Sequence, residues 1–254
     1  MEYLLHTNGL TKQYGRHKAV NAVNIHIRQG DIYGLIGRNG AGKTTYFNVI
    51  TGMYNPTEGK VLFHDKEITG RKPYEITSLG LARTFQNIRL FANMTVIENV
   101  MVGMQCKTSA GVLDGIFHTP KHRKEEKLVE EKAAHYLELT GLLDHRYDYA
   151  TSLPYGKQRK LEIARAMAAE PEILLLDEPA AGMNGQETEE LAEFIHSLKD
   201  MGYTILLIEH DMKFVMSLCD NIYVLDHGSL IAQGPPAEIK QNPRVIEAYL
   251  GKEE

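Results

Sequence analysis

The feature that most constrains the fold is a glycine-rich loop at residues 37–44, with the sequence GRNGAGKT. It follows an apolar run, Ile32–Ile36, that predicts a buried strand, and it leads into a predicted helix at about 42–51. In this strand–loop–helix context the pattern is typical of a loop that binds nucleotide phosphates. Glycines let the backbone approach an anion closely, and the helix N-terminus directs N–H groups at it. The loop therefore predicts a nucleoside triphosphate site.

Side chains at the end of this loop are the expected ligands of the phosphates and of a metal. We expect Lys43 to reach the β- and γ-phosphates and Thr44 to offer its hydroxyl to Mg²⁺. Thr45 is expected to hydrogen-bond the α-phosphate. The predicted phosphate-binding set is Gly37, Arg38, Asn39, Gly40, Ala41, Gly42, Lys43, Thr44 and Thr45.

Length and charge limit the classes of protein to consider. The 254 residues fit one large or two small domains with a full core. A net charge of −5 argues against a dedicated nucleic-acid binder. No run approaches 18 apolar residues, and the start lacks the pattern of a secretory signal. We therefore expect neither a membrane-spanning helix nor a nucleic-acid partner.

The chain in order predicts an α/β protein with a helical insert. Strands at 3–10 and 19–28 indicate an antiparallel sheet that leads into a mainly parallel one. A helix-rich block follows, with a helix at 95–106, a loop at 107–120 and a charged helix at 121–139. In the last, four basic residues at 121–124 are followed at once by glutamates, which favours a solvated face over a membrane-surface patch. The predicted division is an ATPase core at 1–86 and 160–254 and a helical subdomain at about 87–159.

Acidic residues follow a second buried strand, Ile173–Leu176, in a Walker B arrangement. We expect Asp177 to hold Mg²⁺, and Glu178 to orient or deprotonate the attacking water. Gln86 and His210 also come at or just beyond predicted strand ends, where ligands bind in α/β sheets. From the residues alone, surface polarity is the favoured explanation of Gln86, whereas a structural and a functional role are equally supported for His210.

Tyr14 lies in a connection before the phosphate loop. An exposed aromatic side chain there would stack on a base, whereas a ring packed on the sheet would be structural. The spacing alone favours the structural interpretation.

Several motifs in one order resemble the ATP-binding subunit of ABC transporters over essentially the whole chain. They are Tyr14, the loop at 37–45, Gln86, Leu153–Gln158, Asp177–Glu178 and His210. Within that family, five stretches look like the branched-chain amino-acid import group. These are RTFQNIRLF at 83–91, MTVIENV at 94–100, YGKQR at 155–159, LEIAR at 161–165 and EPAAGMN at 178–184.

The resemblance implies a role for each matching residue. Tyr14 matches the aromatic residue that stacks on adenine, and Asp177 matches the Walker B metal ligand. Gln86 matches the glutamine that touches Mg²⁺ and the attacking water and signals to the membrane subunits. Glu178 matches the catalytic carboxylate, and His210 matches the switch histidine at the γ-phosphate.

Residues 153–157 match the signature motif, which acts on ATP held by the opposite subunit, but they depart from its usual Leu-Ser-Gly-Gly-Gln. Pro154 replaces the serine, Tyr155 the first glycine and Lys157 the glutamine, while Gly156 keeps the second glycine. The serine contact with the γ-phosphate is therefore missing. Backbone N–H groups at Gly156 and at a helix that starts near Lys157 are expected to point at phosphate, and the Lys157 ammonium to add charge. Asn184 stands where the family usually has aspartate.

As a whole, the resemblance implies an ATPase that powers solute import, with ATP and Mg²⁺ as cofactors. Its partners would be a second ATP-binding subunit, identical or different, and two integral membrane permease subunits seated near residues 86–100. An extracytoplasmic solute-binding protein would act indirectly. The chain would lie on the cytoplasmic face of the inner membrane, and the solute would be branched-chain amino acids or a similar small molecule. The alternatives are a soluble ABC-type ATPase with no membrane role and a nucleotide sensor that does not hydrolyse ATP.

Overall fold

An antiparallel sheet forms the N-terminal part of the computed structural model, which describes residues 3–105 and 120–250. Its strands run in the order β2-β1-β5-β6, and β3 also pairs with β1. Side chains of β1 alternate, so that Leu5 and Thr7 are buried while Asn8 is exposed. The bounds are β1 (Leu5–Tyr14), β2 (His17–Val23), β3 (His26–Ile27), β5 (Glu58–Phe63) and β6 (Lys66–Glu67).

A second, mainly parallel sheet carries the strand ends that matter for function. Its order is β11-β10-β4-β9-β8-β7, and each neighbouring pair is parallel except β10 with β11. Every residue of β4, β8 and β9 is buried, as expected for parallel strands covered on both faces. The bounds are β4 (Ile32–Ile36), β7 (Leu81–Arg83), β8 (Ile173–Asp177), β9 (Thr204–Ile208), β10 (Asn221–Asp226) and β11 (Ser229–Gly234).

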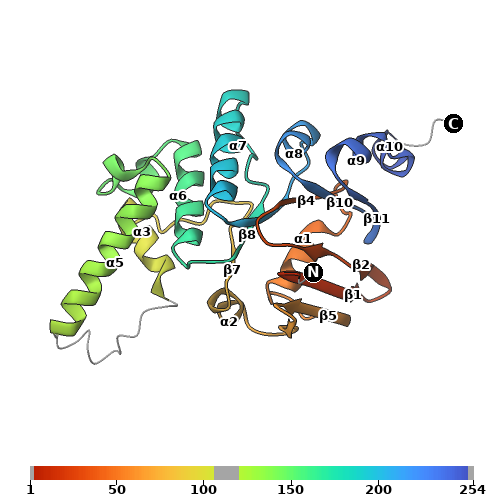
Figure 1. Cartoon of the computed structure of the whole chain (residues 1–254), viewed down its shortest axis with the longest axis horizontal. Coiled ribbons are helices and arrows are strands. Elements are labelled where there is room, and N and C mark those ends of the chain that lie inside the picture. The colour runs from red at the N-terminus through yellow and green to blue at the C-terminus, as the bar shows by residue number, and fades with distance from the viewer. Residues whose placement is uncertain (1–2, 106–119, 251–254) are drawn as a thin grey trace.

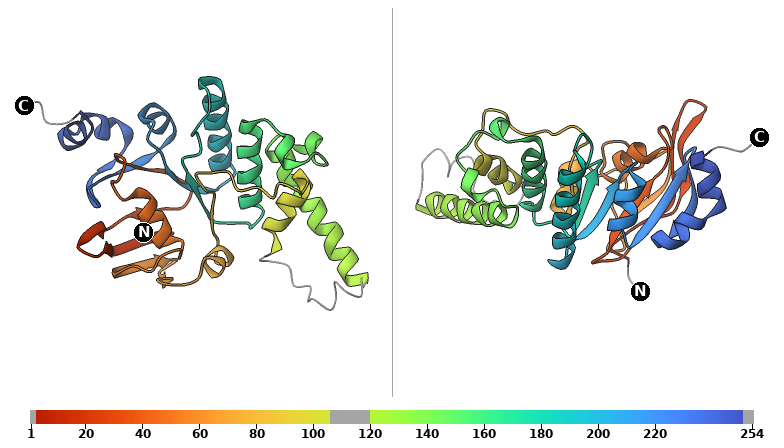
Figure 2. Two further views of the ribbon diagram at one scale, coloured as in Figure 1. Left: turned by 180° about the vertical axis from the view of Figure 1, so that it is seen from behind. Right: turned by 90° about the horizontal axis from the view of Figure 1, so that it is seen from above.

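Helices cover the parallel sheet and also form the predicted insert. Figure 1 shows α3 and α5 gathered away from both sheets, with α6 between them and the parallel sheet, and the view from above in Figure 2 places this group at the opposite end from α9 and α10. In the described residues, no helix is both long and apolar enough to cross a membrane. The bounds are α1 (Lys43–Ile50), α2 (Pro73–Ser78), α3 (Val96–Gly103), α5 (Pro120–Leu139), α6 (Tyr155–Met167), α7 (Gly185–Asp200), α8 (Met212–Leu218), α9 (Pro236–Gln241) and α10 (Pro243–Leu250), with single 3₁₀ turns at Leu143–His145 and Ala150–Ser152.

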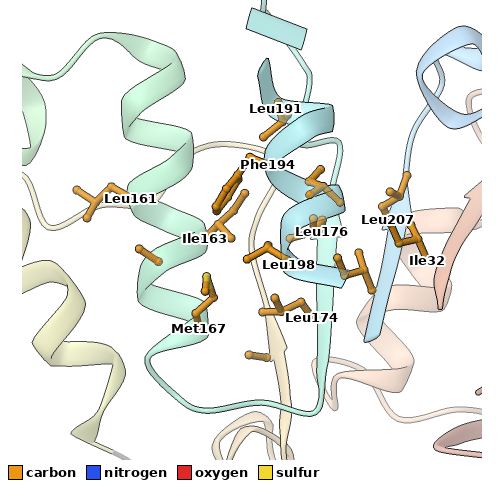
Figure 3. Close-up of a cluster of buried hydrophobic side chains, with 14 of the residues drawn as sticks. Ile32, Leu161, Ile163, Met167, Leu174, Leu176, Leu191, Phe194, Leu198 and Leu207 are labelled. Carbon is orange, nitrogen blue, oxygen red and sulfur yellow. The ribbon is translucent and has the colours of Figure 1, made fainter. Parts of the chain in front are cut away.

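Two apolar clusters hold these layers together. One fills the space around α1 and the antiparallel sheet, and the other joins α6 and α7 to the opposite face of the parallel sheet. Figure 3 shows the second contact, which includes Ile163, Met167, Leu174, Leu176, Phe194 and Leu198. Full burial of each such side chain contributes about 1.5–3 kcal/mol, so α6 is firmly anchored to the sheet.

The predicted α/β architecture is confirmed. The helix predicted at 95–106 forms as α3, which begins with a capping box of Thr95 and Glu98. The strand predicted before Gln86 ends at Arg83, because side chains of α6 take the main-chain groups of Phe85. The helix predicted near Lys157 begins two residues earlier, since extended Pro154 caps it. The predicted loop at 107–120 lies outside the described residues except for its last residue, which begins α5. The predicted subdomain boundary at 159/160 falls inside α6 and stays a prediction.

Candidate functional site

The phosphate loop leaves β4, enters α1 and curls around the Lys43 ammonium group. Lys43 Nζ donates to the carbonyl oxygens of Gly37 at 2.6 Å and Arg38 at 3.2 Å, and Lys43 is only 6% exposed. Gly42 has φ of +102°, and a Cβ atom there would lie 2.1 Å from the Ala19 carbonyl oxygen. The loop is therefore held in one shape by its backbone. Arg38, Asn39, Gly40 and Thr44 are exposed, and Ala41 and Thr45 are not.

Three carboxylates act electrostatically on the Lys43 ammonium group. Burial lowers the pKa of Lys43. The negative charges of Glu178, Asp177 and Glu209 act in the opposite direction and partly offset this effect. The phosphate loop and the strand-end acids thus act on one another electrostatically, as expected when β4, β8 and β9 are parallel neighbours.

Asp177 is the last residue of β8 and is buried. Its Oδ2 atom accepts a hydrogen bond of 2.6 Å from Arg83 Nη2 in an almost fully buried ion pair. Arg83 Nη1 donates to Asn48 Oδ1 at 2.7 Å, which fixes the guanidinium group from the other side. The sequence prediction gave Arg83 no role, although a cation inside an apolar strand was an available signal. The ion pair orients Asp177 and leaves Oδ1 for other ligands.

Gln86, Glu178 and His210, from three different segments, meet at the same edge of the sheet. Gln86 Nε2 donates to Glu178 Oε2 at 2.7 Å, and His210 Nδ1 lies 3.9 Å from the same oxygen. Glu178 has φ of +46°, a left-handed conformation that costs about 1–3 kcal/mol for such a residue. Its N–H group donates to the Ile208 carbonyl oxygen at 2.9 Å, which holds the unusual turn.

Glu209 is a second functional candidate that the sequence prediction left without a role. It is 1% exposed, and burial raises the pKa of its carboxyl group. Its Oε1 accepts from the Ala180 N–H at 2.9 Å, and its Oε2 accepts from the His210 N–H at 3.1 Å. Glu209 therefore ties the segment after Glu178 to the predicted switch histidine. An acid directly after an apolar strand was the signal available in the sequence.

Tyr14 lies at the turn between β1 and β2 and is 47% exposed. Its ring meets Tyr54 edge-on at 6.4 Å, and Lys12 Nζ lies 5.2 Å from its centroid. The ring is therefore accessible. In the described part of the chain, no hydrogen bond or ring contact joins it to the phosphate loop, so its stacking on adenine stays a prediction.

The signature residues belong to the helical end of the molecule. Pro154 caps α6 without a side-chain hydrogen bond, and Gly156 lies in the first turn. Lys157 Nζ lies 2.7 Å from His145 Nε2, and His145 Nδ1 lies 2.8 Å from Asp148 Oδ2. Because an ammonium group only donates, His145 accepts through Nε2 and keeps its proton on Nδ1. The Lys157 charge is thus engaged within its own subdomain.

The donor set at the strand ends fits a magnesium nucleotide. The Thr44 hydroxyl is exposed, Asp177 keeps one oxygen beyond its ion pair, and Gln86 keeps its amide oxygen because its Nε2 donates to Glu178. Mg²⁺ prefers such oxygen ligands and takes the remainder from phosphates and water. The parallel sheet, the phosphate loop and these strand-end acids define the class of the protein as a P-loop nucleoside triphosphatase.

Comparison with known proteins gives the family within this class. The ABC transporter family matches residues 20–181, and the branched-chain amino acid ATP-binding cassette transporter family matches residues 229–254. The chain therefore belongs to the ABC transporter family as an ATP-binding subunit with ATPase activity, which confirms the predicted resemblance.

Full-length relatives and solved structures agree with this assignment. The chain is 49% identical over 98% of both chains to the high-affinity branched-chain amino acid transport ATP-binding protein LivG of Escherichia coli K12. It is 46% identical, again over 98% of both chains, to the corresponding protein BraF of Pseudomonas aeruginosa PAO1. The ADP conformation of MJ1267, an ATP-binding cassette of an ABC transporter, has a TM-score of 0.86 and 36% identity, over 99% of this chain and 100% of that one.

Proposed function

We propose that the chain hydrolyses ATP to power the import of branched-chain amino acids, as a peripheral subunit on the cytoplasmic face of the inner membrane. The observation that carries the ATPase half is the meeting of Gln86 with Glu178 beside the buried Lys43. Similarity to LivG and BraF, both named as branched-chain amino acid transport proteins, supports the choice of solute.

The chemistry follows from the strand-end residues. Bound Mg²⁺, held by Thr44, Gln86 and Asp177, would neutralise phosphate charge. Lys43 binds the β- and γ-phosphates, and Tyr14 stacks on adenine. Glu178 takes the proton of the attacking water, while Gln86 holds the Glu178 carboxylate and the water in place. A general base of this kind raises the rate about 10²- to 10⁴-fold.

His210 completes the arrangement at the γ-phosphate. Its backbone N–H is fixed by Glu209, whereas its imidazole is 59% exposed and therefore free to reach the nucleotide. When the γ-phosphate leaves, this contact is lost and the site opens.

A second ATP-binding subunit completes each site through its signature motif. Pro154 has no hydroxyl to donate to the γ-phosphate, and Lys157 is engaged by His145, so the backbone N–H groups of the first turn of α6 remain as donors. This half of the composite site is therefore weaker in a homodimer than beside a partner with a complete signature. We expect the isolated chain to hydrolyse ATP more slowly than the assembled transporter, and equal rates would contradict this expectation.

The permease subunits dock in a groove beside the Gln86 segment. The groove has a volume of about 600 Å³ and is lined by aromatic and charged side chains that include Tyr74, Phe85, Arg89 and Phe91. Tyr74 is 64% exposed and Phe91 45% exposed, which leaves both rings available for a cytoplasmic permease segment. The groove is lined by Arg83, which pairs with Asp177, and by Phe85, which precedes Gln86, so permease movement would reach the strand ends directly.

The decisive experiment measures uptake of labelled leucine, isoleucine and valine into vesicles that contain the transporter and its solute-binding protein. We expect ATP-dependent uptake with the parent chain and none with Glu178→Gln. Tyr74→Ala should reduce co-purification with the permeases after mild detergent extraction, whereas Tyr147→Ala, at a residue that is 65% exposed outside the groove, should not. A chain that hydrolyses ATP but never co-purifies with membrane subunits would favour the soluble ATPase instead.

A further inference from the structure

A closed ring of hydrogen bonds joins the signature helix to the two residues expected to handle the attacking water. Arg159 Nη2 donates to the Gln86 carbonyl oxygen at 2.9 Å and lies 3.4 Å from Tyr155 Oη. The Tyr155 hydroxyl donates to the Ala181 carbonyl oxygen at 3.0 Å, and the Ala181 N–H donates to the Glu178 carbonyl oxygen at 3.2 Å. The Gln86–Glu178 side-chain bond of 2.7 Å closes the ring.

The ring rests on a fully buried ion pair within α6. Arg159 and Glu162 are 0% and 1% exposed, and Arg159 Nη1 donates to Glu162 Oε2 at 2.7 Å. The same Nη1 donates to the Phe85 carbonyl oxygen at 2.8 Å, while Glu162 Oε1 accepts from the N–H groups of Phe85 and Arg89 at 3.4 Å. All of these bonds hold the backbone around Gln86. Desolvation of a buried ion pair offsets much of its attraction, so this pair orients the backbone more than it stabilises the fold.

We propose that Tyr155 and Arg159 are positioning residues of the ATPase reaction, which set the distance between the Gln86 amide and the Glu178 carboxylate of the same chain. This inference rests on the proposed roles of Gln86 and Glu178. The signature helix then has two tasks, since its N-terminus faces the partner's nucleotide while its first two turns hold the chain's own catalytic edge. Tyr155 stands where the family usually has glycine, so the hydroxyl arm of the ring depends on this particular departure.

The ring also links movement of α6 to the residues that carry out ATP hydrolysis. Residues 155 and 159 lie on α6, Gln86 follows β7, and Ala181 follows β8. Any shift of α6 against the sheet edge must therefore stretch at least one ring bond. The bond between Gln86 and Glu178 joins the two arms of the ring and is one of the bonds that such a shift strains.

The test compares substitutions that open the ring at one bond. Tyr155→Phe removes only a hydroxyl from a residue that is 42% exposed, so the fold should be retained. In the transporter purified with its own partner subunits, we expect kcat for ATP to fall about 3- to 10-fold, the range of one lost hydrogen bond, with KM within about twofold. Tyr149→Phe, in the same subdomain and 61% exposed, is the matched control and should leave kcat unchanged.

Arg159→Lys keeps the charge but replaces the planar fork by one point donor, so it should lower kcat further, by about 10- to 100-fold, with KM again unchanged. In a Gln86→Ala background, Tyr155→Phe should change kcat by less than about twofold, because the distance it sets no longer matters.

A kcat for Tyr155→Phe equal to that of the Tyr149→Phe control would overturn the proposal. So would a loss expressed in KM, or a full multiplicative loss on top of Gln86→Ala. Glu178→Gln, measured in parallel, separates the two claims: if it retains turnover, the proposed role of Glu178 is wrong. If it loses turnover while Tyr155→Phe matches its control, only the ring is wrong.

Discussion

The phosphate loop and the ring around Arg159 solve the problem of placing a functional group in opposite ways. The loop is one continuous segment whose shape is fixed by glycine conformations and main-chain contacts, with Lys43 bonded to the loop's own carbonyl oxygens. The ring assembles side chains from three segments, and its central bond spans 73 residues of sequence between Arg159 and Gln86. The local structure of the phosphate loop suits it to hold a ligand, whereas the long-range contacts of the ring suit it to transmit movement.

The largest effect is expected at the point where the two regions meet. Glu178→Gln removes the general base but keeps an amide of similar size beside Gln86. Turnover should fall about 10²- to 10⁴-fold while ATP binding persists and favours a closed dimer. Phosphate release and ATP binding, measured on the same transporter preparation, check this, and unchanged turnover would assign the base to another group.

The backbone character of the phosphate loop is tested by two matched glycine substitutions. Gly42→Ala places a Cβ atom 2.1 Å from the Ala19 carbonyl oxygen, whereas a Cβ at Gly40 has no neighbour within 4 Å. Both glycines have positive φ, so alanine at either position carries the strain of that conformation. We expect Gly42→Ala to lower the free energy of unfolding by about 1–3 kcal/mol more than Gly40→Ala, because a backbone atom must move. Equal urea-unfolding midpoints would contradict a loop fixed by main-chain packing.

The smallest effect concerns Glu209, which links the strand edge to His210. Burial raises the pKa of this carboxyl above its ordinary value of 4.5, so the folded state binds a proton more tightly than the unfolded state. The parent should therefore lose stability relative to Glu209→Gln as pH rises from 4.5 through the raised pKa. Urea unfolding of both proteins from pH 4.5 to 8 measures the difference. A difference that does not change with pH would show that Glu209 is not held at a raised pKa.

The two regions also differ in how far the sequence predicts them. The phosphate loop and Asp177–Glu178 are visible because each is a short pattern directly attached to an apolar strand. Arg83 and Glu209 were present in the same patterns, but their partners lie on other strands, and strand order is not encoded locally. The ring was invisible for the same reason, since nothing in the local sequence indicates that Tyr155 meets Ala181.

The start of the signature helix α6 is a boundary that the sequence predicted two residues too late. The helix was predicted to begin near Lys157. Extended Pro154 sets the start at Tyr155 instead. That shift also brings Tyr155 and Arg159 one helical turn apart, on the face that meets the Gln86 segment.

The most direct test of the division between the two regions is the equilibrium dissociation constant for ATP, measured by titration of the full chain and of its Lys43→Ala and Tyr155→Phe variants. Lys43→Ala should weaken binding by about 10- to 100-fold, the loss of a charge-assisted contact with phosphate, while Tyr155→Phe should bind within about twofold of the parent. Equal losses in the two variants, or no loss with Lys43→Ala, would contradict the assignment of binding to the loop and positioning to the ring.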